Sequence, residues 1–219
     1  MKKLEDYLYY EEKEPALKIY HGDCLDVMPL LPTVDLVVTD PPYGINYQSA
    51  RRTDKTQWKD KIHGDKEYPL WIFNYKPNNA TFVCCRWDTL YKIPQPKSLI
   101  VWDKKCHSMG DLEHEFGRQW EAIAFYPKEN HKFVKRPVDL IRCAKVPPER
   151  LRHPNEKPPS LFRPILESHA GSICDPFMGS GSVLMACKEL NRNGIGIEIS
   201  EKYCEIAKKR LRATTKSLF

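Results

Sequence analysis

The carboxy-terminal third of the chain contains the stretch that most constrains the fold. Residues 171–174 predict a strand, 175–181 a glycine-rich turn, 182–190 a helix, 194–199 a second strand and 201–211 a closing helix. Strand, turn, helix and strand in this order make a βαβ unit, whose right-handed crossover gives two parallel strands. The sequence therefore predicts an α/β fold built on a mostly parallel sheet.

A second stretch ends a predicted buried strand with an unusual turn. Residues 34–39 are mostly apolar and β-branched, which is typical of a strand buried on both faces of a parallel sheet. Asp40-Pro41-Pro42-Tyr43 follows, and two successive prolines cannot continue a strand. Because open α/β sheets bind ligands at the carboxyl ends of their strands, we predict a catalytic loop here. The alternative is an ordinary strand-ending turn that carries a surface tyrosine.

Two carboxylates accompany the glycine-rich turn. Asp175 and Glu198 each stand at the end of a predicted strand, while Gly179 and Gly181 allow the backbone to approach a ligand closely. The turn is not G-x-G-x-x-G, and an acidic residue inside it would repel a pyrophosphate, so NAD is a poor candidate. A cationic cofactor with an adenosine end, such as S-adenosylmethionine (SAM), suits this charge better. The alternative is a tight strand-to-helix connection with no ligand.

Length and composition fit one folded domain. At 219 residues, 41% hydrophobic and 29% charged, the chain is long enough for one well-cored domain and too short for two. We predict a single domain over residues 1–219, in which residues 1–16 form a loosely packed arm. Further strands are predicted at 17–21, 81–85, 99–102 and 121–126, and further helices at 25–31, 110–119 and 158–169.

Basic residues concentrate in two segments. The loop at about 44–66 interleaves Lys and Arg with aromatic residues, and the segment at about 128–152 carries eight Lys or Arg against three Asp or Glu. With a formal net charge of +6, this pattern fits a nucleic-acid partner, with the 128–152 segment as a surface that contacts the nucleic-acid backbone. The alternative for the first loop is a solvated charged loop. The candidate contacts are Arg51, Arg52, Lys55, Lys59, Lys132, Lys135 and Arg136.

Cysteine usage and hydropathy set further limits. The eight cysteines form no C-x-x-C pair and mostly lie in apolar runs, so we predict reduced core thiols and no metal site. Cys106, His107 and His114 lie close in sequence but lack a second pair of ligands. No apolar run approaches the length of a membrane span, and the amino terminus is no signal peptide. We therefore expect a soluble, cytoplasmic protein without a membrane partner.

Several motifs in this order resemble those of the adenine-N6/cytosine-N4 DNA methyltransferases. The resemblance covers about residues 17–211 and follows the permuted arrangement called group β, in which the catalytic tetrapeptide precedes the cofactor glycine loop. The matching motifs are His21-Gly22-Asp23-Cys24-Leu25, Asp40-Pro41-Pro42-Tyr43-Gly44-Ile45, Val101-Trp102-Asp103-Lys104, His153-Pro154-Asn155-Glu156-Lys157-Pro158 and Asp175-Pro176-Phe177-Met178-Gly179-Ser180-Gly181.

The resemblance implies a Rossmann-like SAM-dependent methyltransferase fold, with a twisted, mostly parallel sheet and helices on both faces. Asp40 and Asp175 would then face one cleft. By the same resemblance, Asp23 bonds the adenine of SAM, Glu198 its ribose, and Lys157 its methionine carboxylate. The full set of implied cofactor residues is Asp23, Cys24, Lys157, Asp175, Phe177, Gly179, Ser180, Gly181 and Glu198.

The implied reaction is methyl transfer from SAM to the N6 amine of an adenine flipped out of double-stranded DNA. The Asp40 side chain and the Pro41 carbonyl would hold the amine hydrogens, Pro42 would fix the turn and Tyr43 would stack on the base. Direct in-line transfer needs no covalent enzyme intermediate.

The identity of the substrate stays open at this point. Asp40 favours adenine, since cytosine-N4 enzymes of the family mostly carry Ser at this position. Cytosine-N4 methylation, an RNA substrate and a non-catalytic nucleic-acid-binding subunit are the alternatives. The resemblance leaves only about residues 128–152 as a DNA-recognition segment, and this short length fits a short target site, relaxed specificity or a homodimer. A solitary or restriction-modification enzyme of a bacterial or phage-infected cell fits the compact length.

Overall fold

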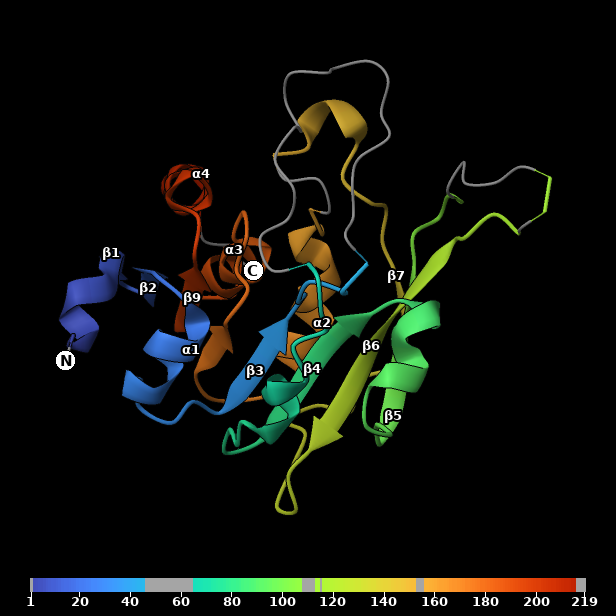
Figure 1. The fold of residues 1–219 in the computed structure, drawn as a ribbon, viewed down its shortest axis with the longest axis horizontal. Coiled ribbons are helices and arrows are strands. Elements are labelled where there is room, and N and C mark those ends of the chain that lie inside the picture. Colours follow the sequence, from blue (N-terminus) through green and yellow to red (C-terminus); the bar gives the residue numbers. More distant parts are fainter. Residues whose placement is uncertain (1, 46–64, 108–112, 115, 153–155, 216–219) are drawn as a thin grey trace.

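The structure, a computed structural model, describes residues 2–45, 65–107, 113–114, 116–152 and 156–215. A single nine-stranded sheet runs through these residues (Figure 1). The strand order is β1-β2-β9-β8-β3-β4-β6-β5-β7. Only β1 and β6 run antiparallel to their neighbours, so the predicted mostly parallel sheet is confirmed. The strands are β1 (Leu8–Lys13), β2 (Ala16–His21), β3 (Leu36–Thr39), β4 (Ala80–Cys85), β5 (Ser98–Asp103), β6 (Trp120–Pro127), β7 (Leu140–Arg142), β8 (Ile173–Asp175) and β9 (Gly194–Glu198).

Helices cover both faces of this sheet. The α-helices are α1 (Cys24–Val27), α2 (Pro159–Glu167), α3 (Ser182–Glu189) and α4 (Glu201–Ala213). Shorter 3₁₀ helices are η1 (Leu4–Tyr7), η2 (Met28–Leu30), η3 (Leu70–Asn74), η4 (Trp87–Lys92) and η5 (Pro148–Arg150). Within the described part of the chain, none of these helices has the length and apolar character needed to cross a membrane.

Strand β3 shows how the two faces are filled. All four of its residues are buried, as predicted for a strand with both faces covered. Leu36 and Val38 pack into the core that includes α2, α3 and α4, whereas Val37 packs into the core that includes α1 and η3. The alternation follows from the two-residue repeat of a strand, and it places helices on both faces as predicted.

The position of β3 next to β8 decides where a ligand can bind. The two strands are parallel neighbours, with Leu36 opposite Ile173 and Val37 opposite Cys174. From β3 the chain continues to β4 on one side, whereas from β8 it continues to β9 on the other. Such a switch point leaves a crevice at the carboxyl ends of the two strands. The Asp40 loop and the Asp175 turn therefore leave the sheet at the same edge, here called the catalytic edge.

Two local predictions were wrong. Residues 4–13 form η1 and β1 rather than a loose arm: β1 covers the edge of β2, and the Glu12 carboxylate lies 2.8 Å from the Lys188 ammonium. The described residues between 113 and 119 form turn and coil instead of a helix. Phe116 in this segment is 99% exposed, so no buried apolar face supports a helix there.

The first half of the basic segment, which follows β6, lies far from the catalytic edge. Because β6 runs antiparallel to β4, its last residue pairs with the first residue of β4, at the amino edge of the parallel strands (Figure 1). Backbone hydrogen bonds hold the segment there, from Lys128 N to Asn79 O and from Val134 N to Ser168 O, each 2.8 Å long. A six-residue strand spans about 20 Å, so the two edges are separated by about that length.

We predict that the central core residue Phe82 contributes strongly to stability. Its side chain is 2% exposed and stacks on Phe125, so Phe82→Ala should leave a cavity and lower the free energy of unfolding by about 3–5 kcal/mol. Phe116→Ala, which removes the same atoms from an exposed position, should change the free energy by less than about 0.5 kcal/mol. Urea unfolding measures both variants, and equal losses would contradict the assigned core.

Candidate active site

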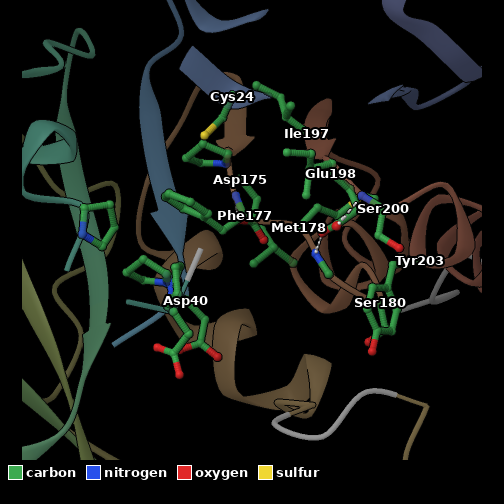
Figure 2. A pocket seen from close by; sticks show the side chains of 18 of the residues that line it. Cys24, Asp40, Asp175, Phe177, Met178, Ser180, Ile197, Glu198, Ser200 and Tyr203 are labelled. Atoms are coloured by element: carbon green, nitrogen blue, oxygen red, sulfur yellow. Dashed lines mark hydrogen bonds between the residues drawn. The ribbon is translucent and has the colours of Figure 1, made fainter. Parts of the chain in front are cut away.

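A cavity of about 590 Å³ opens at the catalytic edge, beside the ends of β3, β8 and β9. Figure 2 shows Asp40 on one side of this cavity and Glu198, Ser200 and Tyr203 on another, with Phe177 between them in this view. Its volume lies within the range of about 300–1,000 Å³ that is usual for sites of small ligands and cofactors. The two unusual motifs of the sequence thus line one cavity.

A buried hydrogen bond joins these two motifs. Thr39 Oγ1, at the end of β3, donates to Asp175 Oδ1 at 2.6 Å, and Phe177 N donates to the same oxygen at 3.1 Å. Burial raises the pKa of the Asp175 carboxyl to about 7, against the lowering effect of these two donors. A buried carboxylate of this kind favours a cationic ligand, because such a ligand supplies the countercharge that the protein does not.

The glycine-rich turn is arranged around Glu198. The Glu198 carboxylate accepts hydrogen bonds from Gly179 N at 2.9 Å and from Ser200 N at 2.8 Å, and burial raises its pKa. Gly181 has φ +85° at the start of α3, a left-handed conformation that favours glycine. Arg210 Nη1 donates to both Ser180 O and Ser180 Oγ, at 2.7 and 2.8 Å, and so fixes the turn from α4.

Asp23 and Cys24 complete the acidic side of the cavity. Asp23 is the N-cap of α1, and its Oδ1 accepts from Leu25 N at 2.9 Å. The Cys24 thiol is buried, and burial raises its pKa to about 12, so it stays protonated. Among the described residues, no group of three or more His, Cys, Asp or Glu side chains is placed to hold a metal ion.

An aromatic wall of the cavity was missed by sequence reasoning. Trp71, in η3, lines the cavity with its ring centroid 5.8 Å from that of Phe177, at an interplanar angle of 40°. Irregular 3₁₀ turns show no hydrophobic periodicity, so the sequence around Trp71 gives no signal of this role.

The Asp40 carboxylate is held by two neighbours. Tyr43 OH donates to Oδ1 at 2.6 Å, and Lys157 Nζ donates to Oδ2 at 2.8 Å. The Tyr43 ring is buried, and burial together with the charge of Asp40 raises the pKa of its phenol. Stacking of Tyr43 on a base stays a prediction, because it requires one face of this ring to become accessible.

Lys157 has partners other than the one implied by the resemblance. Its ammonium lies between Asp40 Oδ2 and Glu121 Oε2, the second at 3.3 Å, so it neutralises protein carboxylates on the Asp40 side of the cavity. Glu121, the second residue of β6, was not identified from the sequence because it belongs to none of the motifs. The neighbouring motif residues His153, Pro154 and Asn155 lie outside the described residues.

The predicted DNA contacts fall into two groups. Arg51, Arg52, Lys55 and Lys59 lie outside the described residues. Lys132, Lys135 and Arg136 are exposed on the segment at the opposite edge of the sheet from Asp40. The antiparallel course of β6 carries these three residues to the far edge, a placement that the sequence did not predict.

Other basic and aromatic side chains lie at the catalytic edge. Trp87 follows the end of β4, Trp120 begins β6, and both are about half exposed, at 53% and 45%. The Arg118 guanidinium lies 5.8 Å from the centroid of the Trp87 ring. The sequence did not single out these residues, because they are spread over two connections that only the sheet brings together.

The chain is similar to known DNA methyltransferases. A DNA methylase family profile, N6/N4 type, matches residues 141–209. The type II methyltransferase M.ScaI of Streptomyces caespitosus is 24% identical over 274 residues, covering 96% of this chain and 86% of that protein. The DNA adenine methyltransferase YhdJ of Escherichia coli (strain K12) is 26% identical over 250 residues, covering 90% and 83%.

A solved structure shows the same likeness in three dimensions. The crystal structure of the M1.HpyAVI–SAM complex superposes with a TM-score of 0.66 at 25% identity, covering 89% of this chain and 98% of that chain. The fold and the cavity at its catalytic edge define an α/β methyltransferase. Within that class, the chain is similar to DNA methylases of the N6/N4 family.

We predict that ionisation of Asp175 costs stability in the free protein. Its folded-state pKa of about 7 lies above its ordinary value of 3.8, so stability falls as the pH rises from about 4 to 7. Asp175→Asn keeps an acceptor for Thr39 and removes this cost. It should raise the free energy of unfolding by on the order of 2–4 kcal/mol at pH 8 and by little at pH 4.

Urea unfolding at pH 4, 6 and 8 measures this difference. Asp139→Asn, at an exposed position before β7, serves as the matched control and should change stability by less than about 0.5 kcal/mol at each pH. An Asp175→Asn effect of the same size at pH 4 and pH 8 would show that this carboxyl has an ordinary pKa.

Proposed function

We propose that the protein is a SAM-dependent DNA methyltransferase that modifies the N6 amine of adenine. The observation that carries the proposal is that Asp40 and the carboxylates of Asp175 and Glu198 line one cavity, at the ends of the three neighbouring strands β3, β8 and β9. The family match and the adenine activity named for YhdJ support it. The order of the two loops along the chain fits the permuted group β arrangement.

The side chains of the cavity fit SAM. Asp175 and Glu198 provide negative charge for a sulfonium ion and acceptors for ribose hydroxyls, and Asp23 provides a further acceptor. Trp71 and Phe177 provide an apolar wall. SAM supplies an activated methyl group on its sulfonium. A pairing of Lys157 with the methionine carboxylate stays a prediction from the resemblance, since its ammonium binds Asp40 and Glu121.

The Asp40 loop supplies what an amine needs in order to react. The adenine N6 lone pair is delocalised into the ring, so the free amine is a poor nucleophile. Asp40 and the Pro41 carbonyl accept its two hydrogens and direct the lone pair at the methyl carbon. The lone pair forms the new N–C bond, the electrons of the C–S bond stay on sulfur, and the amine then releases one proton to the Asp40 carboxylate.

The target strand must reach the catalytic edge. A base inside a duplex is inaccessible, so double-stranded DNA must release the target nucleotide into the cavity. Trp87, Trp120 and Arg118 lie at this edge and offer stacking surfaces and positive charge to the strand beside the target. Among the described residues, the proposed DNA contacts therefore lie on η4 and on the connection from β5 to β6.

We predict that Asp40 is essential for methyl transfer and that adenine is the product base. DNA incubated with the protein and SAM should yield N6-methyladenine by mass spectrometry of nucleosides. Asp40→Ala should lower the rate by at least about 10³-fold, since it removes the acceptor that orients the amine. Asp139→Ala, which removes an exposed carboxylate far from the cavity, should retain the wild-type rate.

The same assay separates the alternatives. N4-methylcytosine in place of N6-methyladenine would assign the protein to the other branch of its family. Methylation of RNA but not of DNA would overturn the assignment of the polymer. Binding of DNA without any methylated product or measurable SAM affinity would make the chain a non-catalytic subunit.

We predict that the catalytic edge, and not the basic far edge, contacts DNA. Arg118→Ala should weaken duplex binding and reduce the slope of log K against log salt by about 1, because one phosphate contact is lost. Arg136→Ala removes the same side chain from the far edge and should leave both quantities unchanged. Fluorescence anisotropy with a labelled duplex measures them; the reverse pattern would show DNA spanning the far edge, as in a homodimer.

A further inference from the structure

Glu121 lies in the site but belongs to none of the sequence motifs. It is the second residue of β6, whose antiparallel course begins at the catalytic edge, opposite Trp102 near the end of β5. Its side chain is 25% exposed and lies among charged groups beside the Asp40 loop. The strand direction alone brings it there, because the sequence separates it from both Asp40 and Lys157.

Four charged groups form an alternating chain at this point. Lys104 Nζ lies 3.3 Å from Glu121 Oε1, and Glu121 Oε2 lies 3.3 Å from Lys157 Nζ. Lys157 Nζ in turn lies 2.8 Å from Asp40 Oδ2. The two ammonium and two carboxylate groups have a formal charge of zero. The next cation, Arg86, is paired bidentately with Asp88.

Glu121 and Lys157, the two middle groups of this chain, are both charged at neutral pH. Burial on its own lowers the pKa of Lys157, but the carboxylates of Asp40 and Glu121 outweigh burial and raise it above its ordinary value. Burial on its own raises the pKa of Glu121, but the ammonium groups of Lys157 and Lys104 outweigh burial and lower this pKa below its ordinary value. With a side chain only 7% exposed, Lys157 depends on these neighbours and not on water for its countercharge.

The net charge of these four groups affects the proposed methyl transfer. As the methyl group arrives, positive charge develops on the amine nitrogen that Asp40 holds. An ammonium 2.8 Å from Asp40 opposes that charge and also opposes proton transfer to the carboxylate. Glu121 offsets this effect with a carboxylate on the other side of the same ammonium.

We propose that Glu121 is a positioning residue for the methyl transfer, an inference that rests on the proposed function. It holds the Lys157 ammonium against Asp40 Oδ2, so that the orientation of the Asp40 carboxylate is fixed from behind. It also keeps the charge beside the amine close to zero. Lys104 fixes Glu121 in turn. Glu121 acts through Lys157 and Asp40 and does not itself touch the substrate.

Charge-changing variants separate this role from a purely structural one. Glu121→Gln keeps the shape but leaves a net positive cluster, and should lower kcat at least about tenfold while the Kd for SAM changes less than about threefold. Glu121→Gln combined with Lys104→Met restores neutrality and should recover at least about half of the decrease in log kcat. Glu121→Asp, which keeps the charge, should fall between the wild type and Glu121→Gln.

Multiple-turnover rates at saturating SAM and DNA give kcat, calorimetry gives the Kd for SAM, and thermal unfolding checks that each variant is folded. A folded Glu121→Gln variant with kcat within twofold of wild type would overturn the proposal. So would a double variant that is no faster than Glu121→Gln alone. Activity in the wild type and its loss in Asp40→Ala test the proposed function separately.

A second readout needs neither SAM nor DNA. Brief acetylation with acetic anhydride, followed by peptide mass spectrometry, measures how readily the Lys157 amine reacts relative to the exposed Lys97. Loss of the Glu121 charge should make Lys157 less strongly protonated and raise its relative reactivity at least about threefold in Glu121→Gln. An unchanged ratio would show that Glu121 does not hold Lys157, whatever reaction the protein catalyses.

Discussion

The hydrogen bond from Thr39 Oγ1 to Asp175 Oδ1 marks the constraint on which the site depends, namely that β3 and β8 are parallel neighbours. The chain continues from β3 to β4 on one side of this pair and from β8 to β9 on the other, so the carboxyl ends of both strands border one crevice. Residues 136 positions apart in sequence thereby share a buried contact. The loop proposed to hold the target amine and the turn proposed to hold the methyl donor are fixed relative to each other by the sheet itself.

The two sides of the cavity differ in charge, and the difference suits methyl transfer. The side of Asp175 and Glu198 is acidic, and burial raises the pKa of both groups in the free protein. On the side of Asp40, the ammonium groups of Lys104 and Lys157 balance the carboxylates of Asp40 and Glu121. A cationic donor is thus attracted to one side, while the other can accept charge as it develops on the amine. Carboxylates buried without a countercharge lower stability, a cost that is common in binding sites.

The distribution of charge over the surface depends on strand direction more than on local composition. The segment 128–152 is the most basic part of the described chain, yet its first half lies at the far edge of the sheet. Trp87, Arg118 and Trp120 belong to less conspicuous stretches and lie at the catalytic edge. A dense run of basic residues therefore did not indicate the face that is proposed to receive DNA.

The sequence by itself determined the mostly parallel α/β fold, and it predicted a site at the ends of β3 and β8 with an acidic cofactor side. These follow from local rules: β-branched apolar runs form buried strands, prolines stop them, and glycines permit tight turns. Only the tertiary structure decided that Lys157 binds Asp40 and Glu121, that Trp71 faces Phe177, and that Lys135 lies far from the site. Each of these depends on strand order and direction, which bring together residues that no local pattern connects.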